Sequence, residues 1–414
     1  MKKGLRYRTR ELYHPERISI FPIEEYTSRM TKVREAMARD RIDLLYCSAP
    51  ESLFYLTGYE SSWYRSGSPR EWPPLSGLVI KQDVDDPIFF EMAEEEVLVR
   101  TTSIVADVRM LDFESAEYII DFVLKSLDHQ GWLRGTVGFE KLSYRPHPYA
   151  SGLFQSALEE RGLRVVDASH IVREIRAVKS PLEMAYVRVA SRIADIGLKA
   201  ALDHVCPGMT EIELRAEIDY ACANAGGENP GLATYVHGGP KSAANHMLAS
   251  RRIIKPGDVV YIDLCGVYHR YHADVARTLC LGEPDSAVAR QVELSAKAWP
   301  LLLETIRPNL PFAELTKTMR AYYEEAGIWE DRWWVGGYDL GIAFPPDWVG
   351  VFSYDPETDP GEWAMVPGTV VNYESDFYLP KGAGMSAIMD TIAVGEDKAE
   401  ILSTIPQELI VVEE

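Results

Sequence analysis

A strand motif that ends in an acid occurs twice in this chain, and it constrains the fold more than any other feature. The two copies are PGDVVYID at residues 256–263 and PGTVVNYE at residues 367–374, so Asp263 and Glu374 hold equivalent positions. Upstream, PG followed by EL at residues 207–214 returns as PN followed by EL at residues 308–315. A helix-then-hairpin unit that recurs predicts an internally duplicated domain, whose two acidic strands form one shared carboxylate site.

The first copy has the pattern of a β-hairpin. A turn at residues 256–258 precedes an apolar strand at 259–264, and a loop at 265–271 leads to a second strand at 274–281, which carries Asp274. An acid among Val, Ile and Leu must be ion-paired, metal-bound or protonated, because a lone buried carboxylate is too costly. An ion pair with Arg270 or Arg277 is the purely structural alternative.

Length and charge narrow the class of protein. The 414 residues suit two domains, and an apolar content of 46% supports sizeable cores. The net charge of −20 argues against a nucleic-acid partner. The five cysteines are scattered without a CxxC pair, which is typical of reduced thiols, and no apolar run is long enough to cross a membrane. We therefore expect a cytoplasmic protein with no membrane partner.

The domain organisation follows from the order of elements. Residues 1–20 are expected to form an arm, and helix–strand alternation over residues 21–170 predicts an α/β domain. A linker near residues 167–179 leads to a second domain at residues 171–414. Two capping boxes, Ser180 with Glu183 and Thr210 with Glu213, predict helix starts in that second domain.

Two loops contain candidate functional residues. Trp63, Tyr64 and Arg65 lie in an irregular aromatic segment, which suits either a substrate surface or simple packing. His237 lies in a glycine-flanked loop, and His246 follows it shortly before the acidic hairpin. A histidine at either place suits acid–base chemistry, and a structural role is the alternative.

Several of these stretches resemble one known family. SLFYLTGYES at residues 52–61, REIRAVKSPLEM at residues 173–184 and the block at residues 255–282 resemble the creatinase/aminopeptidase P/methionine aminopeptidase (M24) family. The resemblance covers nearly the whole chain. It implies an N-terminal creatinase-like α/β domain followed by a C-terminal pita-bread domain with duplicated helix–hairpin units. It also implies a homodimer, in which the loop at residues 63–72 reaches the active site of the partner subunit.

Metal-dependent members of that family hold two metal ions with Asp, Asp, His, Glu and Glu. Asp263, Asp274 and Glu374 match three of these ligands, whereas Tyr338 occupies the histidine position and Met389 the second glutamate position. A phenol and a thioether are poor ligands for hard divalent metals, so the resemblance implies no intact dinuclear centre. A weaker site for manganese, cobalt, iron or zinc on the three acids stays open. The residues that could substitute in it are His272, Asp376 and Asp390.

The strings YHRYHADVARTLCLGEP and GYDLGIAFPPDW resemble the metal-independent branch of creatinase and ectoine hydrolase, which cleaves a C–N bond in small cationic or zwitterionic compounds. Asp263 departs from the ectoine-hydrolase type, where we expect Glu, and Asp274 stands where we expect no acid.

His246 matches the position of the family's catalytic histidine. The implied catalytic residues are His246, Glu374, Asp263 and Asp274. The implied substrate-binding residues are Tyr338, Trp63, Tyr64, Arg65, His272 and His237.

Charge repulsion supports a cationic substrate independently. Each close pair of carboxylates costs about 4 kcal/mol at moderate dielectric, so a cation or a proton must offset the charge. Two mechanisms stay open: His246 activates water and protonates the leaving nitrogen, or Asp263 attacks the substrate carbon directly. A metal-dependent Xaa-Pro dipeptidase or aminopeptidase is the enzymatic alternative. A non-catalytic binding module, like the histone-chaperone subunit that resembles these peptidases, is the other alternative.

Overall fold

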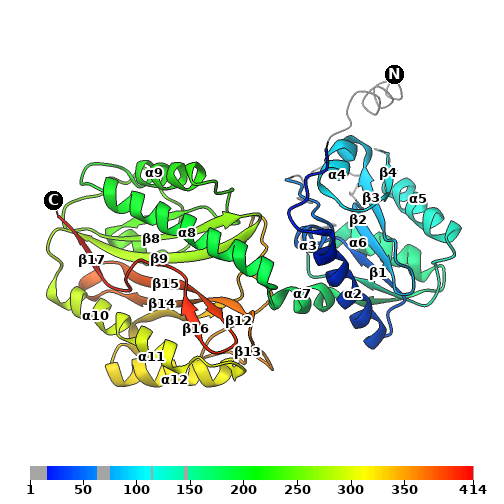
Figure 1. Cartoon of the computed structure of the whole chain (residues 1–414). Coiled ribbons are helices and arrows are strands. Elements are labelled where there is room, and N and C mark those ends of the chain that lie inside the picture. The colour runs from blue at the N-terminus through cyan, green and yellow to red at the C-terminus, as the bar shows by residue number, and fades with distance from the viewer. Residues whose placement is uncertain (1–15, 63–74, 113–114, 144–147, 414) are drawn as a thin grey trace. The chain divides into compact units, whose positions relative to one another are not determined.

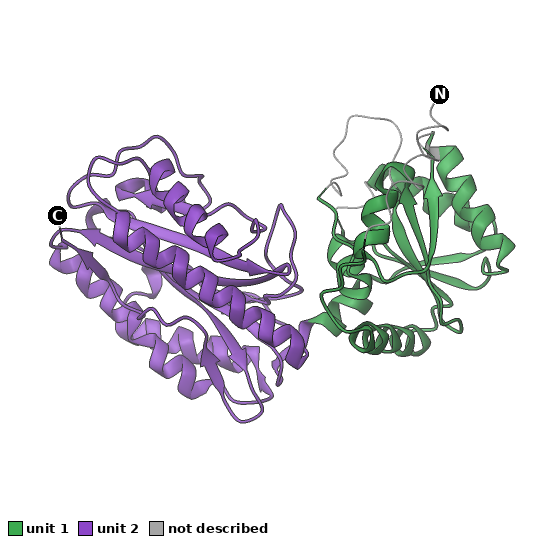
Figure 2. Cartoon of the chain, turned by 45° about the horizontal axis from the view of Figure 1, so that its top comes forward, with its two compact units in different colours: residues 1–176 green, residues 177–414 purple. Residues whose placement is uncertain are grey.

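The structure is a computed structural model that describes residues 16–62, 75–112, 115–143 and 148–413. The chain divides into two compact units, residues 1–176 and residues 177–414 (Figure 2). The expected boundary at residue 170 falls at the start of helix α7, Ser169–Ala177, and the division lies near the end of that helix. Most of the expected arm at residues 1–20 is outside the described residues. None of the described helices is long and apolar enough to cross a membrane.

The first unit is an α/β domain built on a six-stranded mixed sheet with the order β4-β3-β2-β1-β5-β6 (Figure 1). Strand β1 pairs in parallel with β5 and antiparallel with β2. The rings of Tyr46, Phe139 and Phe154 meet in its core, with centroids 5.0–5.8 Å apart. Its elements are α2 (Ile23–Arg39), β1 (Leu44–Cys47), α3 (Pro50–Thr57), β2 (Gly77–Lys81), β3 (Ile88–Met92), α4 (Glu96–Thr102), β4 (Asp107–Leu111), α5 (Ala116–His129), β5 (Thr136–Phe139), α6 (Pro148–Glu159) and β6 (Arg164–Asp167).

The second unit contains a nine-stranded sheet. Its main path is β12-β11-β14-β15-β9-β8-β7, with β16 on β15 and β17 on β9 (Figure 1). Its elements are α8 (Pro181–His204), α9 (Glu211–Asn224), β7 (Tyr235–Gly238), β8 (Val259–Tyr268), β9 (Tyr271–Leu281), α10 (Ser286–Ala296), α11 (Ala298–Thr305), β10 (Leu310–Pro311), α12 (Phe312–Ala326), β11 (Arg332–Tyr338), β12 (Ser353–Tyr354), β13 (Ala364–Met365), β14 (Val370–Tyr378), β15 (Met385–Val394), β16 (Ala399–Ile401) and β17 (Ile410–Val412).

The order of these strands is the same on both sides of the central β9–β15 pair. On one side β9 is followed by β8 and β7, and on the other side β15 is followed by β14 and β11. The two strands that carry the repeated motif, β8 and β14, therefore occupy matching places in the sheet. The internal duplication itself stays a prediction.

One face of this sheet is apolar and lies against the helices. Side chains alternate between the faces of a strand, so Ile262, Val275 and Ile388 all point to the same side. Two core clusters lie on that side: one packs α8 and α9 against β8 and β9, and the other packs α10, α11 and α12 against β14 and β15. Asp263, Asp274 and Glu374 alternate with these residues and therefore lie on the opposite face.

The acidic hairpin is longer than the sequence indicates. Strand β8 ends at Tyr268 and strand β9 begins at Tyr271, so the prediction of a loop at residues 265–271 is wrong. Only His269 and Arg270 form the turn, and both have positive φ, 47° and 63°, as a two-residue hairpin turn requires. Glu228 accepts hydrogen bonds from the backbone N–H groups of both residues, at 2.8 and 2.9 Å. The polar residues around the turn hid the strand pattern.

Helix boundaries in the second unit follow from caps and from one proline. Both expected capping boxes are confirmed, at the starts of α8 and α9. Residues 286–305 form two helices, α10 and α11, which are separated at Lys297. Pro300 explains the division: proline lacks the N–H of the helical ladder, and its ring clashes with the carbonyl of Ala296.

Candidate active site

The candidate site is a layer of acids on the face of the nine-stranded sheet opposite α8 to α12. Pairing registers join Tyr235 to Asp263, Asp263 to Ala276, Ala276 to Met389 and Met389 to Glu374. Both motif acids therefore lie on one rung that crosses β7, β8, β9, β15 and β14. Asp274 precedes Ala276 by two residues on the same face. The structure thus brings together the three acids that the sequence predicts to share a site.

An asparagine bridges two of the acids. Asn372, two residues before Glu374 on β14, donates from Nδ2 to Oε1 of Glu374 at 2.5 Å and to Oδ2 of Asp274 at 3.1 Å. The hydroxyl of Tyr261 donates to Oδ2 of Asp263 at 2.8 Å. The second oxygens of Asp263 and Asp274 are buried and receive no hydrogen bond from an N–H or O–H donor of the described residues. The two carboxyl groups interact directly with each other, so a proton shared between them or a donor on a bound molecule can satisfy these oxygens.

The acids are held in a low-dielectric, negatively charged environment. Burial, and next the charge of Asp274, raises the pKa of Glu374 to about 8. Burial likewise raises the pKa of Asp274 to about 6, and burial together with Asp274 and Glu374 raises the pKa of Asp263 well above its usual range. The cluster therefore retains protons at pH values where exposed carboxylates have lost them.

No described arginine neutralises the cluster. Arg277 is fully buried on the opposite face of the sheet, where its Nη2 donates to both carboxylate oxygens of Asp390 at 3.0 Å. Arg270 pairs with Glu228 at 3.5 Å. The purely structural alternative, an ion pair from Arg270 or Arg277 to the motif acids, is therefore wrong.

His246 lies beside the acid layer, in an exposed turn after the short 3₁₀ helix Gly239–Ala243. Its ring lies edge-on to Trp333, with centroids 5.3 Å apart, and 6.4 Å from the ring of Tyr235. Tyr235 is the β7 residue paired with Asp263. His246 is therefore near enough for its ring to share one site with the acids and sufficiently exposed to exchange protons with water.

The two other candidate histidines are buried and neutral. Burial lowers the pKa of His272 to about 3, and it lowers that of His237 to about 4. His272 donates from Nδ1 to the carbonyl of Arg270 and accepts at Nε2 from the N–H of Gly231, both at 2.9 Å. Both nitrogens of His272 are thus engaged with backbone. His237 bonds through Nε2 to the carbonyl of Met247, while its Nδ1 has no partner among the described residues.

Tyr338 occupies the end of β11 and points toward Asp274. Its hydroxyl donates to Oδ2 of Asp274 at 3.4 Å and accepts from Nε1 of Trp348 at 2.9 Å. Burial, and next the charge of Glu374, raises the pKa of Tyr338 well above its usual range, so the phenol stays neutral. Trp63, Tyr64 and Arg65 lie outside the described residues.

Comparison with known proteins identifies the family. The model for metallopeptidase family M24 matches residues 185–396, and the model for the creatinase/prolidase N-terminal domain matches residues 29–178. The first match alone spans more than half of the chain. The chain belongs to metallopeptidase family M24. The creatinase-like N-terminal domain and the two-domain α/β fold of this family are confirmed.

Relatives within M24 differ in their activities. The chain is 27% identical to the ectoine hydrolase of Halomonas elongata, over 94% of this chain and 98% of that protein. It is 25% identical to the Xaa-Pro dipeptidase of Pyrococcus furiosus, over 92% of this chain and 99% of that protein. The solved structure of dipeptidase PepE from Mycobacterium ulcerans is similar in fold, with a TM-score of 0.78 at 23% identity, covering 95% and 100% of the two chains. Membership of M24 and these relatives support a hydrolase.

The name of metallopeptidase family M24 implies a divalent metal. The side chains that occupy the five metal-ligand positions in this chain, however, do not suit a centre with two metal ions. Tyr338 is already hydrogen-bonded to Asp274 and Trp348, and Met389 offers only a thioether between Ala276 and Glu374. Among the described residues, no group of three or more His, Cys, Asp or Glu side chains is arranged to hold a metal ion. Of the three possible substitutes, His272 is engaged with backbone and Asp390 faces the helices. Asp376 lies on the face of the three acids, two residues after Glu374, and neither of its oxygens is bonded to backbone.

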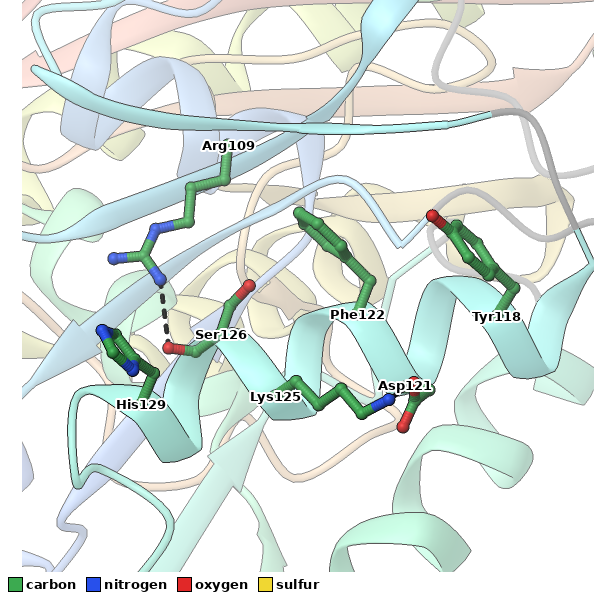
Figure 3. Close-up of a pocket in the computed structure, with 7 residues that line it drawn as sticks. All are labelled: Arg109, Tyr118, Asp121, Phe122, Lys125, Ser126 and His129. Atoms are coloured by element: carbon green, nitrogen blue, oxygen red, sulfur yellow. Dashed lines mark hydrogen bonds and ion pairs between the residues drawn. The ribbon is translucent and has the colours of Figure 1, made fainter.

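A surface pocket in the first unit is unrelated to this site. It lies between β4 and α5 (Figure 3), and Arg109 donates across it to the carbonyl of Ser126 at 3.0 Å. Asp107 pairs with Arg109, and Asp121 pairs with Lys125, each at 2.7 Å. The two basic side chains are thus already neutralised by local partners.

Sequence reasoning missed several side chains of the site. Asn372 has the strongest signal, since it shares the strand face of Glu374 and a buried amide in a motif strand needs polar partners. Tyr261 is two residues before Asp263, and the same periodicity could have found it. Trp348 and Tyr235 carry no such signal, because only the folded sheet places them beside the acids.

Proposed function

We propose that this M24 hydrolase cleaves a C–N bond in a small cationic or zwitterionic nitrogen compound, without a dinuclear metal centre. The observation that carries the proposal is the buried layer of Asp263, Asp274 and Glu374, to which no described basic residue is paired. The replacement of two metal ligands by Tyr338 and Met389 supports it, and so does the similarity to ectoine hydrolase.

Electrostatics favours a positive substrate at this layer. Two carboxylates about 4 Å apart repel by about 4 kcal/mol at an effective dielectric constant of 20. A guanidinium, amidinium or ammonium group between them replaces that repulsion with attraction, and its N–H groups match the unpartnered oxygens of Asp263 and Asp274. Binding of the cation therefore favours loss of protons from the acids, and ionised acids bind the cation more tightly.

In the proposed reaction, His246 removes a proton from a water molecule, and the resulting hydroxide adds to the electrophilic carbon. The C–N bond then breaks, and the imidazolium of His246 returns the proton to the leaving nitrogen. Glu374 and Asp263 orient the cationic centre and stabilise the positive charge that the nitrogen carries. In the alternative, Asp263 attacks the carbon itself, the amine leaves, and water opens the ester that was formed.

Removal of divalent metals should leave activity intact. We expect the purified protein to hold less than one tightly bound metal ion per site, because Tyr338 and Met389 replace two of the five ligands of M24 metallopeptidases. Elemental analysis measures the metal content. The activity is measured before and after chelation as the turnover of ectoine, creatine and an Ala-Pro dipeptide. Two equivalents of metal with loss of activity on stripping would overturn the proposal and favour the Xaa-Pro dipeptidase alternative.

Tyr338→Phe should act mainly on substrate binding. The variant keeps the ring but removes the hydroxyl that donates to Asp274 and accepts from Trp348. A net hydrogen bond contributes about 1 kcal/mol, so we expect KM to rise roughly fivefold with little change in kcat. Steady-state kinetics on the active substrate tests this, with Tyr118→Phe on exposed α5 as the matched control. A fall in kcat at constant KM would assign the hydroxyl to the transition state instead.

A further inference from the structure

A fourth acid lies on the same face of the sheet, beyond the three just described. Asp376 follows Glu374 by two residues on β14, and its side chain is fully buried. Its Oδ2 accepts a hydrogen bond from Nδ2 of Asn245 at 3.4 Å. Asn245 is itself 5% exposed and immediately precedes His246. The pair thus joins β14 to the turn that carries the candidate catalytic histidine.

Both members of the pair keep a buried acceptor without a donor. Oδ1 of Asp376 and Oδ1 of Asn245 have no hydrogen-bond partner among the described residues. Leaving a buried polar atom unpaired costs about 1–3 kcal/mol, and more when the atom is charged. Two such acceptors at one place call for a group that donates several hydrogen bonds.

The surroundings of Asp376 suit a compact cation. Across the strands, Asp376 is paired with Ala387 on β15 and with Trp334 on β11. Directly opposite residues share a face of the sheet, so a methyl group lies on one side and an indole on the other. The indole of Trp334 in turn stacks on Tyr338, with centroids 6.5 Å apart. A tryptophan ring attracts a cation over its face.

We propose that Asp376 and Asn245 form an ammonium-binding subsite beside the acid layer. A primary ammonium offers three N–H donors, which match Oδ1 and Oδ2 of Asp376 and Oδ1 of Asn245. The inference rests on the proposed function and narrows its substrate class. Asp376 and Glu374 are separated by about 7 Å along the strand, at about 3.3 Å per residue. The substrate therefore carries an ammonium group a few bonds away from the C–N bond that is cleaved.

Simple amines test the subsite without knowledge of the substrate. Isothermal titration calorimetry compares putrescine, a diamine, with n-butylammonium, which has one cationic end. We expect the wild-type protein to bind putrescine roughly 10- to 100-fold more tightly, the range for one charge-assisted hydrogen-bonded contact. Asp376→Asn, which conserves shape, should remove this advantage and leave n-butylammonium binding unchanged. The matched control is Asp331→Asn, an exposed site that should change neither affinity.

A second variant keeps the test decisive if Asp376→Asn fails to fold, as judged by thermal melting. Asn245→Ala removes one acceptor and should weaken putrescine severalfold without affecting n-butylammonium. Two outcomes would refute the subsite and leave the proposed function standing. In one, the folded variants still prefer putrescine over n-butylammonium as strongly as the wild type does. In the other, the wild type binds n-butylammonium but does not bind putrescine more tightly. If the wild-type protein binds neither amine, the cationic substrate is refuted together with the subsite.

Discussion

Glu374→Gln is expected to lower kcat/KM by roughly 10²- to 10⁴-fold, the cost of removing one charge from a desolvated ion pair. The substitution conserves shape, and the amide can still accept the hydrogen bond of Asn372 that Oε1 of Glu374 receives at 2.5 Å. The loss is therefore one of charge, directed at a cationic substrate. Steady-state kinetics measures it, with the exposed Glu325→Gln on α12 as the matched control.

The same substitution should stabilise the unliganded protein at alkaline pH. The pKa of Glu374 is raised from 4.5 to about 8, so its folded form binds the proton more tightly than its unfolded form. This contribution to the free energy of unfolding is complete below about pH 4.5 and is lost as the pH rises through about 8. Glutamine stays neutral and avoids the loss.

Thermal melting from roughly pH 5 to roughly pH 9 tests this linkage. We expect the difference in Tm between Glu374→Gln and the wild type to grow with pH, while Glu325→Gln follows the wild type throughout. A variant that is less stable than the wild type at every pH would show that Glu374 is paired with a cation, such as a metal ion, in the folded protein. That result would favour the metallopeptidase alternative.

His246→Ala should lower kcat by roughly 10²- to 10⁴-fold, the range for one general acid–base group. The residue is exposed, and the ring contacts of His246 among the described residues are with Trp333, at 5.3 Å, and with Tyr235, at 6.4 Å. We therefore expect the free energy of unfolding to change little. Kinetics and thermal melting measure the two effects, with the exposed His129→Ala of the first unit as the control.

Full activity of His246→Ala would instead assign the first step to Asp263. A single turnover in isotopically labelled water separates the two routes. Direct attack by Asp263 leaves an unlabelled protein oxygen in the product and the label in the carboxylate of Asp263, whereas attack by water labels the product at once. Mass spectrometry of the protein and the product distinguishes these outcomes.

The charged residues of the second unit show why sequence reasoning succeeds only in part. The repeat of PGDVVYID as PGTVVNYE predicted equivalent strands, and β8 and β14 do occupy matching places in the sheet. The repeat also predicted that Asp263 and Glu374 share one site, and the pairing registers place both acids on one face of the sheet. Strand periodicity could not predict the ion pair between Arg277 and Asp390. That pair depends on the pairing of β9 with β15, which joins residues more than 100 positions apart in the chain.

The sequence by itself determined the family, through the resemblance of several stretches to M24 proteins. It also determined the fold class, the starts of α8 and α9 and the identity of the three motif acids, which depend on local patterns: capping boxes, strand alternation and a repeated motif. Only the tertiary structure decided that Asn372 bridges Asp274 and Glu374, that Trp348 bonds Tyr338, and that Asn245 meets Asp376. Those contacts depend on strand register and on how loops fold over the sheet. Hydrogen bonds act over about 3 Å, whereas Asn372 and Asp274 are 98 positions apart in the chain and Asn245 and Asp376 are 131 apart, so no local pattern encodes these two contacts.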